Sequence, residues 1–210
     1  MHAEVFRDWI VTAARVIEEQ RDHLTQLDAA IGDADHGINL DRGFTAVLSA
    51  MEAAAPATPG AVLTLTGSTL ISKVGGASGP LYGTAFRRAG KALGDAANVD
   101  MPGLAAALEA ALAGVQQLGA AREGDKTMVD ALAPATGAFS KAIAEGASDA
   151  DALAALAEAA QAGAVATISM QALKGRASYL GPRSVGHEDP GAASTALILG
   201  ALRDAALAAP

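Results

Sequence analysis

Three aspartates lie close together in the stretch DAAIGDADHGIN. Asp28, Asp33 and Asp35 are spaced i, i+5 and i+7. On a straight helix, the i+5 side chain points away from the face that i and i+7 share. Gly32 and Gly37 bracket the second and third carboxylates, so the backbone is predicted to leave helical geometry at these glycines. The three carboxylates could then meet at one point.

A cluster of three carboxylates predicts a bound cation, because the charges would otherwise repel one another. The chain has no cysteine and no closely paired histidines, which favours the oxygen-seeking ions Mg2+ or Ca2+ over zinc. Aspartate is also common in solvated turns and helix caps. The aspartates alone therefore leave both interpretations open, and the rest of the chain has to decide between them.

The composition indicates an all-α protein that works without nucleic acid. Half of the 210 residues are hydrophobic, many of them alanine, and only 3% are aromatic, which favours closely packed helices. A net charge of −8 with no Lys/Arg run excludes nucleic acid as the default partner. No signal peptide is visible, and prolines and glycines make residues 53–72 a poor membrane span. A cytoplasmic protein is expected.

Apolar periodicity predicts eight helices and no strand in a single domain, residues 1–210. The first helix is expected over residues 3–27, with Trp9 in the core. The remaining helices are expected over 38–55, 61–74, from about 78 to 93, 102–121, from about 128 to 145, from about 149 to 173, and from 191 to about 208. Antiparallel packing of these helices would form one bundle.

The loops alternate in composition along the chain. Loops 32–37, 75–80, 122–127 and 174–191 are rich in Gly, Asp, Ser, Lys and Arg, whereas the intervening loops are plainer. If neighbouring helices run antiparallel, all four polar loops lie at one end of the bundle. This arrangement predicts the functional site at that end.

The polar loops contain groups suited to phosphates. Backbone amides of the Gly75–Gly79 loop would precede a helix N-terminus, where phosphate oxygens bind well. Lys126, Arg176 and Arg183 add positive charge, and Met128 could contact an adenine face. Each group also has a plain structural explanation as a cap, a core residue or a surface cation. No Walker A loop, dinucleotide fingerprint or hydrolase elbow occurs. Together the groups suit a Mg-nucleotide and phosphoryl transfer.

The loop sequences resemble the nucleotide-binding L subunit of dihydroxyacetone kinase, and the resemblance spans essentially the whole chain. The matching motifs, in chain order, are GDADHG at 32–37, GGASGPLYGT at 75–84, GDKTM at 124–128, KGRASYLG at 174–181 and GHEDPGA at 186–192. This resemblance implies a barrel of eight antiparallel amphipathic helices with the nucleotide site at one end.

The resemblance also implies roles for individual residues. Asp28, Asp33 and Asp35 would be the ligands of two Mg2+ ions, with Asp33, Asp35 and Arg176 acting in catalysis. The implied ADP/ATP contacts are His36, Gly37, Ile38, Asn39, Ala77, Ser78, Gly119, Met128, Arg176, Asp189, Pro190 and Gly191.

By this resemblance, the chain is a phosphotransferase that passes the γ-phosphate of ATP to dihydroxyacetone held covalently on a separate K subunit. Because the chain corresponds to the L part alone, it resembles the phosphoenolpyruvate-dependent form. In that form, ADP stays bound and a phosphohistidine M subunit rephosphorylates it. Two alternatives are an L-type subunit serving another small ketose, and a nucleotide-bound regulatory module.

Overall fold

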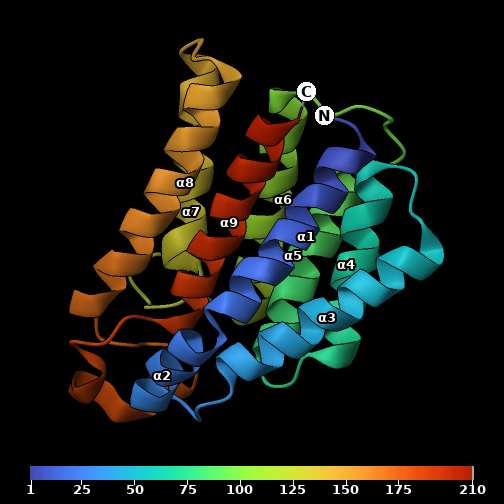
Figure 1. Ribbon diagram of the computed structural model, residues 1–210. Helices are drawn as coiled ribbons and strands as arrows, with labels where there is room; N and C mark the ends of the chain where they lie inside the picture. Colours follow the sequence, from blue (N-terminus) through green and yellow to red (C-terminus); the bar gives the residue numbers. More distant parts are fainter. Residues whose placement is uncertain (210) are drawn as a thin grey trace.

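The computed structural model describes residues 1–209, and this range is entirely helical (Figure 1). Its α-helices are α1 (Ala3–Glu19), α2 (Arg21–Ile31), α3 (His36–Ala54), α4 (Pro59–Lys73), α5 (Ser78–Leu93), α6 (Met101–Gly119), α7 (Val129–Ala144), α8 (Asp149–Ala166) and α9 (Pro190–Ala208). Two 3-10 segments, Thr167–Ser169 and Arg176–Ser184, lie between α8 and α9. The all-α prediction is confirmed.

The predicted helix over 3–27 is two helices, so the described chain has nine α-helices rather than eight. The backbone leaves helical geometry at Gln20, where φ is −99° and ψ is 6°. Beyond this break, α2 buries a short face of its own through Leu24, Asp28 and Ile31. Figure 1 shows α2 at the end of the bundle opposite the two chain termini. The break therefore places Asp28 beside the loops at that end.

The helix predicted to end at residue 173 stops at Ala166. The chain then tightens into the 3-10 turn Thr167–Ser169. The Thr167 carbonyl, which a longer α-helix would use internally, accepts a hydrogen bond from the Lys126 ammonium at 2.6 Å. The same carbonyl accepts the Met170 N–H of the 3-10 turn at 3.0 Å. The contact with Lys126 is one that local periodicity does not report.

The core combines a small aromatic cluster with close helix contacts at small residues. Trp9 packs between Phe6 and Phe86, with ring centroids 6.1 and 5.6 Å away, and its indole N–H donates to the Ile198 carbonyl at 2.8 Å. The prediction that Trp9 is a core residue is confirmed. Helices α4 and α5 approach so closely that a Cβ at Gly67 or Gly90 would collide with the facing backbone.

Two helical stretches, Asp149–Ser169 and Pro190–Ala208, are long and apolar enough by composition to cross a membrane. In each, about half of the most apolar window, 44% and 50%, is buried inside the bundle. Figure 1 shows α8 beside α7, and α9 between α8 and α1. Both helices thus supply part of the core.

Candidate functional site: a carboxylate cluster beside a polar cavity

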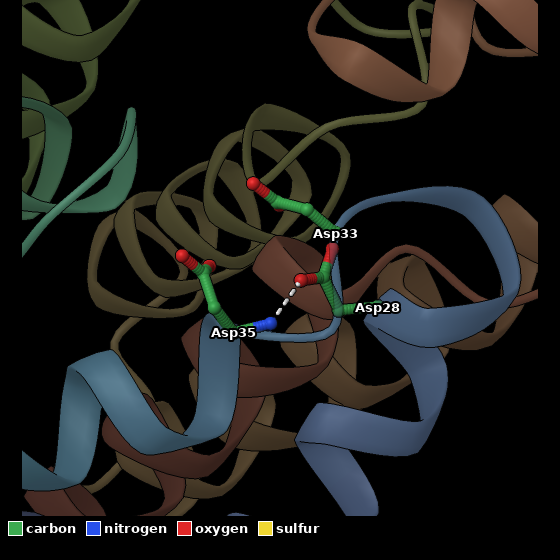
Figure 2. Close-up of side chains that lie close together, drawn as sticks. All are labelled: Asp28, Asp33 and Asp35. Carbon is green, nitrogen blue, oxygen red and sulfur yellow. Dashed lines mark hydrogen bonds between the residues drawn. The ribbon is translucent and has the colours of Figure 1, made fainter.

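The three aspartates of the predicted metal site converge in the structure. Asp28 lies near the end of α2, and Asp33 and Asp35 lie on the turn into α3 (Figure 2). One oxygen from each carboxylate can be chosen so that all three atoms lie within 4.8 Å of one another. Asp28 is buried, whereas Asp33 is exposed and Asp35 half-buried. The cluster therefore has one embedded carboxylate and two that face outward.

The turn that gathers these aspartates depends on Gly32 and on the Asp28 carboxylate. A Cβ at Gly32 would collide with Asp28 Oδ1. Asp28 Oδ2 accepts backbone N–H bonds from Asp35 at 2.9 Å and from His36 at 3.2 Å, the first of which Figure 2 draws as a dashed line. These bonds satisfy free amides at the start of α3. Asp28 is therefore both a candidate ligand and the residue that shapes the turn.

The expectation that the backbone leaves the helix at both flanking glycines is half right. Gly32 caps α2 with φ −137° and ψ −134°, but Gly37 lies inside α3. A Cβ at Gly37 would collide with the Arg21 carbonyl, so this glycine allows α3 to approach α2. The positive φ in the turn falls on Ala34, at 62°, a conformation that costs a residue with a Cβ some strain.

Arg176, from the 3-10 segment after α8, reaches the aspartate cluster. Its guanidinium lies 2.8 Å from Asp33 Oδ2. Both side chains are largely solvent-exposed, 64% and 44%, so this pair contributes little to stability. Its significance is spatial: residues 143 positions apart in the chain place a cation beside the carboxylates.

A cavity of about 770 Å3 adjoins the aspartate cluster. Segments of all four polar loops line it, which confirms the prediction that these loops gather at one end of the bundle. The lining residues outside the aspartate cluster are Ile31, Gly32, His36, Gly75, Gly76, Ala77, Ser78, Leu81, Tyr82, Lys126, Thr127, Met128, Leu173, Lys174, Gly175, Arg176, Ala177, Ser178, Tyr179, Asp189, Pro190 and Gly191.

Four of the residues expected to contact the nucleotide do not line this cavity: Gly37, Ile38, Asn39 and Gly119. Ile38 is half exposed and borders a separate shallow surface hollow with Arg21. Asn39 is buried and accepts a hydrogen bond from Arg42 at 2.8 Å. Gly119 ends α6 beside Leu81, a lining residue. The other eight expected contacts do line the cavity.

A chain of buried hydrogen bonds runs from the cavity into the bundle through His36. Ser78 Oγ lies 3.0 Å from His36 Nδ1, and Ser194 Oγ lies 2.8 Å from Nε2. Tyr82 Oη continues the chain to Ser194 at 2.6 Å and to Thr195 at 2.9 Å. Burial lowers the pKa of His36 to about 4 against the opposing effect of Asp28 and Asp35. A neutral imidazole holds one donor and one acceptor between the two serines.

Lys126 is the buried cation of the cavity wall. Its side chain is only 1% exposed, and its ammonium donates to the carbonyls of Thr167 and His187. Burial lowers the pKa of Lys126, while nearby carboxylates, first among them Asp189, oppose this shift. Its backbone has φ 61°, which is strained for a non-glycine residue. Lys126 therefore connects the α6–α7 loop to the first 3-10 turn, through Thr167, and to the segment before α9, through His187.

Two buried aspartates, Asp130 and Asp189, accept hydrogen bonds in the same region. Asp130 accepts backbone N–H bonds from Gly124 at 2.5 Å and from Thr127 at 2.8 Å. Asp189 caps α9, which begins at Pro190, by accepting the Ala192 N–H at 2.7 Å. Burial raises the pKa of Asp189 to about 7, opposed by the Ala192 and Gly191 amides and by Lys126. Thus buried, hydrogen-bonded charged groups hold the loops beside the cavity.

The sequence predicts only part of the buried hydrogen-bond network beside the cavity. The sequence predicts Lys126 as a phosphate-suited group but not as a buried donor, and it assigns no individual role to Tyr82, Asp130 or Ser194. The compact GDKT motif is the signal for Lys126, since glycine and aspartate beside a lysine are typical of a constrained loop. Tyr82 and Ser194 lie in helices at ordinary core spacing, so no local pattern distinguishes them.

Chemically, the cavity end combines an acidic wall, a helix N-terminus and basic groups. Asp28, Asp33 and Asp35 offer hard oxygen ligands that fit Mg2+ or Ca2+. Free amides at the start of α5, near Ser78, and the guanidinium of Arg176 suit phosphate oxygens. The arrangement can hold a cation between carboxylates and a polyphosphate.

Comparison with known proteins gives the same family throughout. Residues 30–204 match the DAK2 domain. The chain is 42% identical over 192 residues to the ADP-binding subunit DhaL of the phosphoenolpyruvate (PEP)-dependent dihydroxyacetone kinase of Escherichia coli, covering 91% of both chains. It is also 42% identical over 194 residues, with 92% of both chains covered, to the corresponding subunit of kinase 1 of Listeria innocua.

A solved structure shares the fold. It is the dihydroxyacetone kinase from C. freundii in complex with AMP-PNP and Mg2+, matched with a TM-score of 0.71 and 30% identity over 93% of this chain. The present chain spans about a third, 33%, of that longer kinase. By sequence and by fold, the chain belongs to the DAK2 domain family and, within it, to the family of ADP-binding subunits of dihydroxyacetone kinases, which are phosphotransferases.

Proposed function

We propose that this chain binds ADP and ATP with Mg2+ and transfers the γ-phosphate to dihydroxyacetone held covalently on a separate K subunit. A phosphohistidine M subunit then rephosphorylates the ADP in place. The observation that carries the proposal is the convergence of three carboxylates beside a cavity lined by four polar loops. We further propose that residues 1–210 act as one domain, in the cytoplasm.

The donor set fits the proposed metal. Three carboxylates and no thiolate or imidazole ligand form the oxygen environment that Mg2+ prefers. Two Mg2+ ions would be held by Asp28, Asp33 and Asp35, and when bound they would offset the negative charge of the phosphates. The other groups act from the protein itself: the α5 amides near Ser78 bind phosphate oxygens, and Arg176 stabilises charge as it shifts during transfer.

The remaining expected contacts place the nucleoside. Met128 and the Asp189–Gly191 segment lie side by side on the cavity wall, and Met128 offers an apolar, polarisable surface for a base. In the transfer, the bond from the γ-phosphorus to the ADP oxygen breaks as a bond to the dihydroxyacetone hydroxyl oxygen forms. The hydroxyl proton passes to a group of the K subunit, which holds the acceptor.

A calorimetric experiment tests the metal-bridged site. ADP affinity is measured with Mg2+ and again after chelation with EDTA, for the native chain and for the Asp33→Asn and Asp35→Asn variants. We expect EDTA to weaken ADP binding at least tenfold, because the phosphates would then face uncompensated carboxylates. Both variants should lose phosphoryl transfer to a K subunit, with circular dichroism unchanged since Asp33 and Asp35 lie in a turn.

The matched control is Asp22→Asn, an exposed aspartate on α2 outside the cavity. This variant should retain native ADP affinity and transfer. Unchanged ADP affinity in EDTA would refute the metal bridge, and equal transfer by the Asp33 and Asp22 variants would refute the catalytic assignment. Native mass spectrometry of the purified protein adds a second readout: retained ADP supports its role as a resident cofactor.

A further inference from the structure

The helical hairpin α4–α5 has a charge opposite to that of the rest of the molecule. Between Pro59 and Leu93 the sequence contains four basic residues, Lys73, Arg87, Arg88 and Lys91, and no acidic one. With a net charge of −8 for the whole chain, everything outside the hairpin carries −12. A segment of 35 residues with four basic and no acidic residues is unusual in an acidic protein, and it calls for a physical explanation.

Three of these cations surround a groove on the outer face of the hairpin. The groove has a volume of about 850 Å3, comparable to that of the cavity beside the aspartates, and no residue lines both. Its residues are Gly60, Ala61, Thr64, Thr84, Arg87, Arg88, Gly90, Lys91, Gly94 and Asp95. Arg87 is nine residues along α5 from Ser78, about 14 Å at the helical rise. The groove is thus separate from the cavity site.

Small residues give the groove its open shape, and the arginine stems border it. Glycines let α4 and α5 pack backbone to backbone. The Arg87 stem lies over Gly67 of α4, and the Arg88 stem lies over Gly114 of α6. The Arg87 side chain is therefore directed toward α4 and the Arg88 side chain toward α6, and both remain exposed along the groove.

In the described part of the chain, the four cations of the hairpin form no ion pair, and Asp95 is the one acidic residue that lines the groove. Within residues 1–209, seven of the fifteen Lys and Arg residues have a carboxylate within 4.0 Å, but none of the four on the hairpin does. Arg88 donates to the neutral Gln117 side chain at 3.1 Å, which holds the guanidinium in place and leaves its charge free. Lys91 lies in the last turn of α5, where it offsets the helix dipole; that explanation does not extend to Arg87 or Arg88.

We propose that the outer face of the α4–α5 hairpin is a docking surface for a partner protein that presents an acidic surface. The cations are spread over one open face, so they suit several carboxylates spaced along a partner rather than one small anion, which needs converging, buried donors. At physiological salt, charges more than about 8 Å away are screened. A partner docked on the hairpin would therefore interact with the cations of this face, and the acidic groups elsewhere on the chain would repel it only weakly.

Other occupants fit less well. The face has no exposed aromatic side chain, and Ile71 is its one large apolar residue with substantial exposure, 39%, which is a weak anchor for a membrane. A nucleic acid carries charge along its whole length, so it would also meet the acidic remainder of the chain. Complementary charge on a partner protein would steer its approach and set its orientation on this flank.

The test uses a fluorescein-labelled 16-residue peptide of Glu and Ala, with glutamates at helical spacing, and the full-length protein at 50 mM salt. Fluorescence anisotropy compares the native chain with R87Q/R88Q/K91Q and with a control, R15Q/K141Q/R203Q, whose residues pair with carboxylates on α1, α7 and α9. Both triple variants change the net charge equally. We expect at least tenfold weaker binding in the groove variant and less than a twofold change in the control.

Two further measurements keep the outcome decisive. R87K/R88K retains the charges and should keep peptide affinity within twofold, and hydrogen exchange should show peptide protection within residues 59–93. Equal weakening in both triple variants would overturn the proposal, because net charge alone would then explain binding. So would tighter, groove-dependent binding of tripolyphosphate or of phosphatidylglycerol vesicles than of the peptide, since the site would then belong to a small anion or a membrane.

Discussion

The two ends of the helical bundle connect helices in different ways. At the end opposite the cavity, α4, α6 and α8 begin with single caps: Thr58, Asp100 and Ser148 each accept one backbone N–H, at 3.2, 2.8 and 3.1 Å. At the cavity end, the loops are held by buried side chains such as Asp28, which accepts two backbone bonds. Single capping bonds are enough to connect the helices at one end. The buried polar network at the cavity end is therefore not needed for helix connection alone.

The distribution of buried polar residues sharpens this contrast. Eleven of the thirteen in the described chain lie at the cavity end: Asp28, His36, Asn39, Asp125, Lys126, Asp130, Thr167, Ser184, Asp189, Ser194 and Thr195. The other two, Thr66 and Thr136, only bond to carbonyls one turn earlier in their own helices. Desolvated polar groups are costly unless fully paired, so their concentration marks the end where the fold maintains a site.

The largest expected effect comes from removing the buried tie at Lys126. Lys126→Met leaves the His187 carbonyl without its donor, at a cost of about 1–3 kcal/mol for that part-buried acceptor. It also removes one of the two donors to the Thr167 carbonyl, which keeps the Met170 N–H at 3.0 Å, at a further cost of about 0.5–1.5 kcal/mol. We expect urea unfolding to show a loss of about 1.5–4.5 kcal/mol in the free energy of unfolding, together with weaker ADP binding in calorimetry.

The control is Lys141→Met, an exposed lysine near the opposite end. It should change the free energy of unfolding by less than about 0.5 kcal/mol. If the two lysine variants were equally stable, the contrast between the ends of the bundle would fail.

An intermediate effect is expected from adding one methyl group beside Asp28. In Gly32→Ala the new Cβ would collide with the Asp28 carboxylate, so the turn must shift at a cost of about 1–3 kcal/mol. Mg2+-dependent ADP affinity should fall at least tenfold, as measured by calorimetry.

Gly137→Ala is the matched change on α7, where a Cβ meets nothing within 4 Å. It should leave ADP affinity unchanged and stabilise the helix by up to about 1 kcal/mol. Native ADP affinity in the Gly32 variant would show that the carboxylate position does not matter for binding.

A separate effect is a pH dependence at Asp189. Its pKa is about 7 in the fold, raised by burial from an ordinary value of 3.8. Between these values the folded state binds more protons than the unfolded state, so the contribution of Asp189 to stability is present at low pH and declines as pH rises toward 7. The stability of Asp189→Asn relative to the native chain should therefore increase from pH 4 to pH 8 in urea titrations. A difference that is constant with pH would contradict the raised pKa.

Much of the fold was predictable because helix periodicity and capping are local. The capping residues of three helices are visible in the sequence. They are Thr58, Asp100 and Asp189, and each is followed within two residues by a proline. The break at Gln20 and the end of α8 at Ala166 were not visible. The α8 end contacts Lys126, 41 residues away from Thr167. No local pattern encodes such a partner.

The sequence by itself determined the helical class, the alternation of polar and plain loops, and the three aspartates that suit a hard cation. Each depends on spacing along the chain, which the helix repeat translates into faces and ends. Only the tertiary structure decided that Arg176 faces Asp33, that His36 lies between Ser78 and Ser194, and that the cations of the hairpin form no ion pair with any described residue. These arrangements depend on how distant helices pack, and packing selects which charges meet and which remain free.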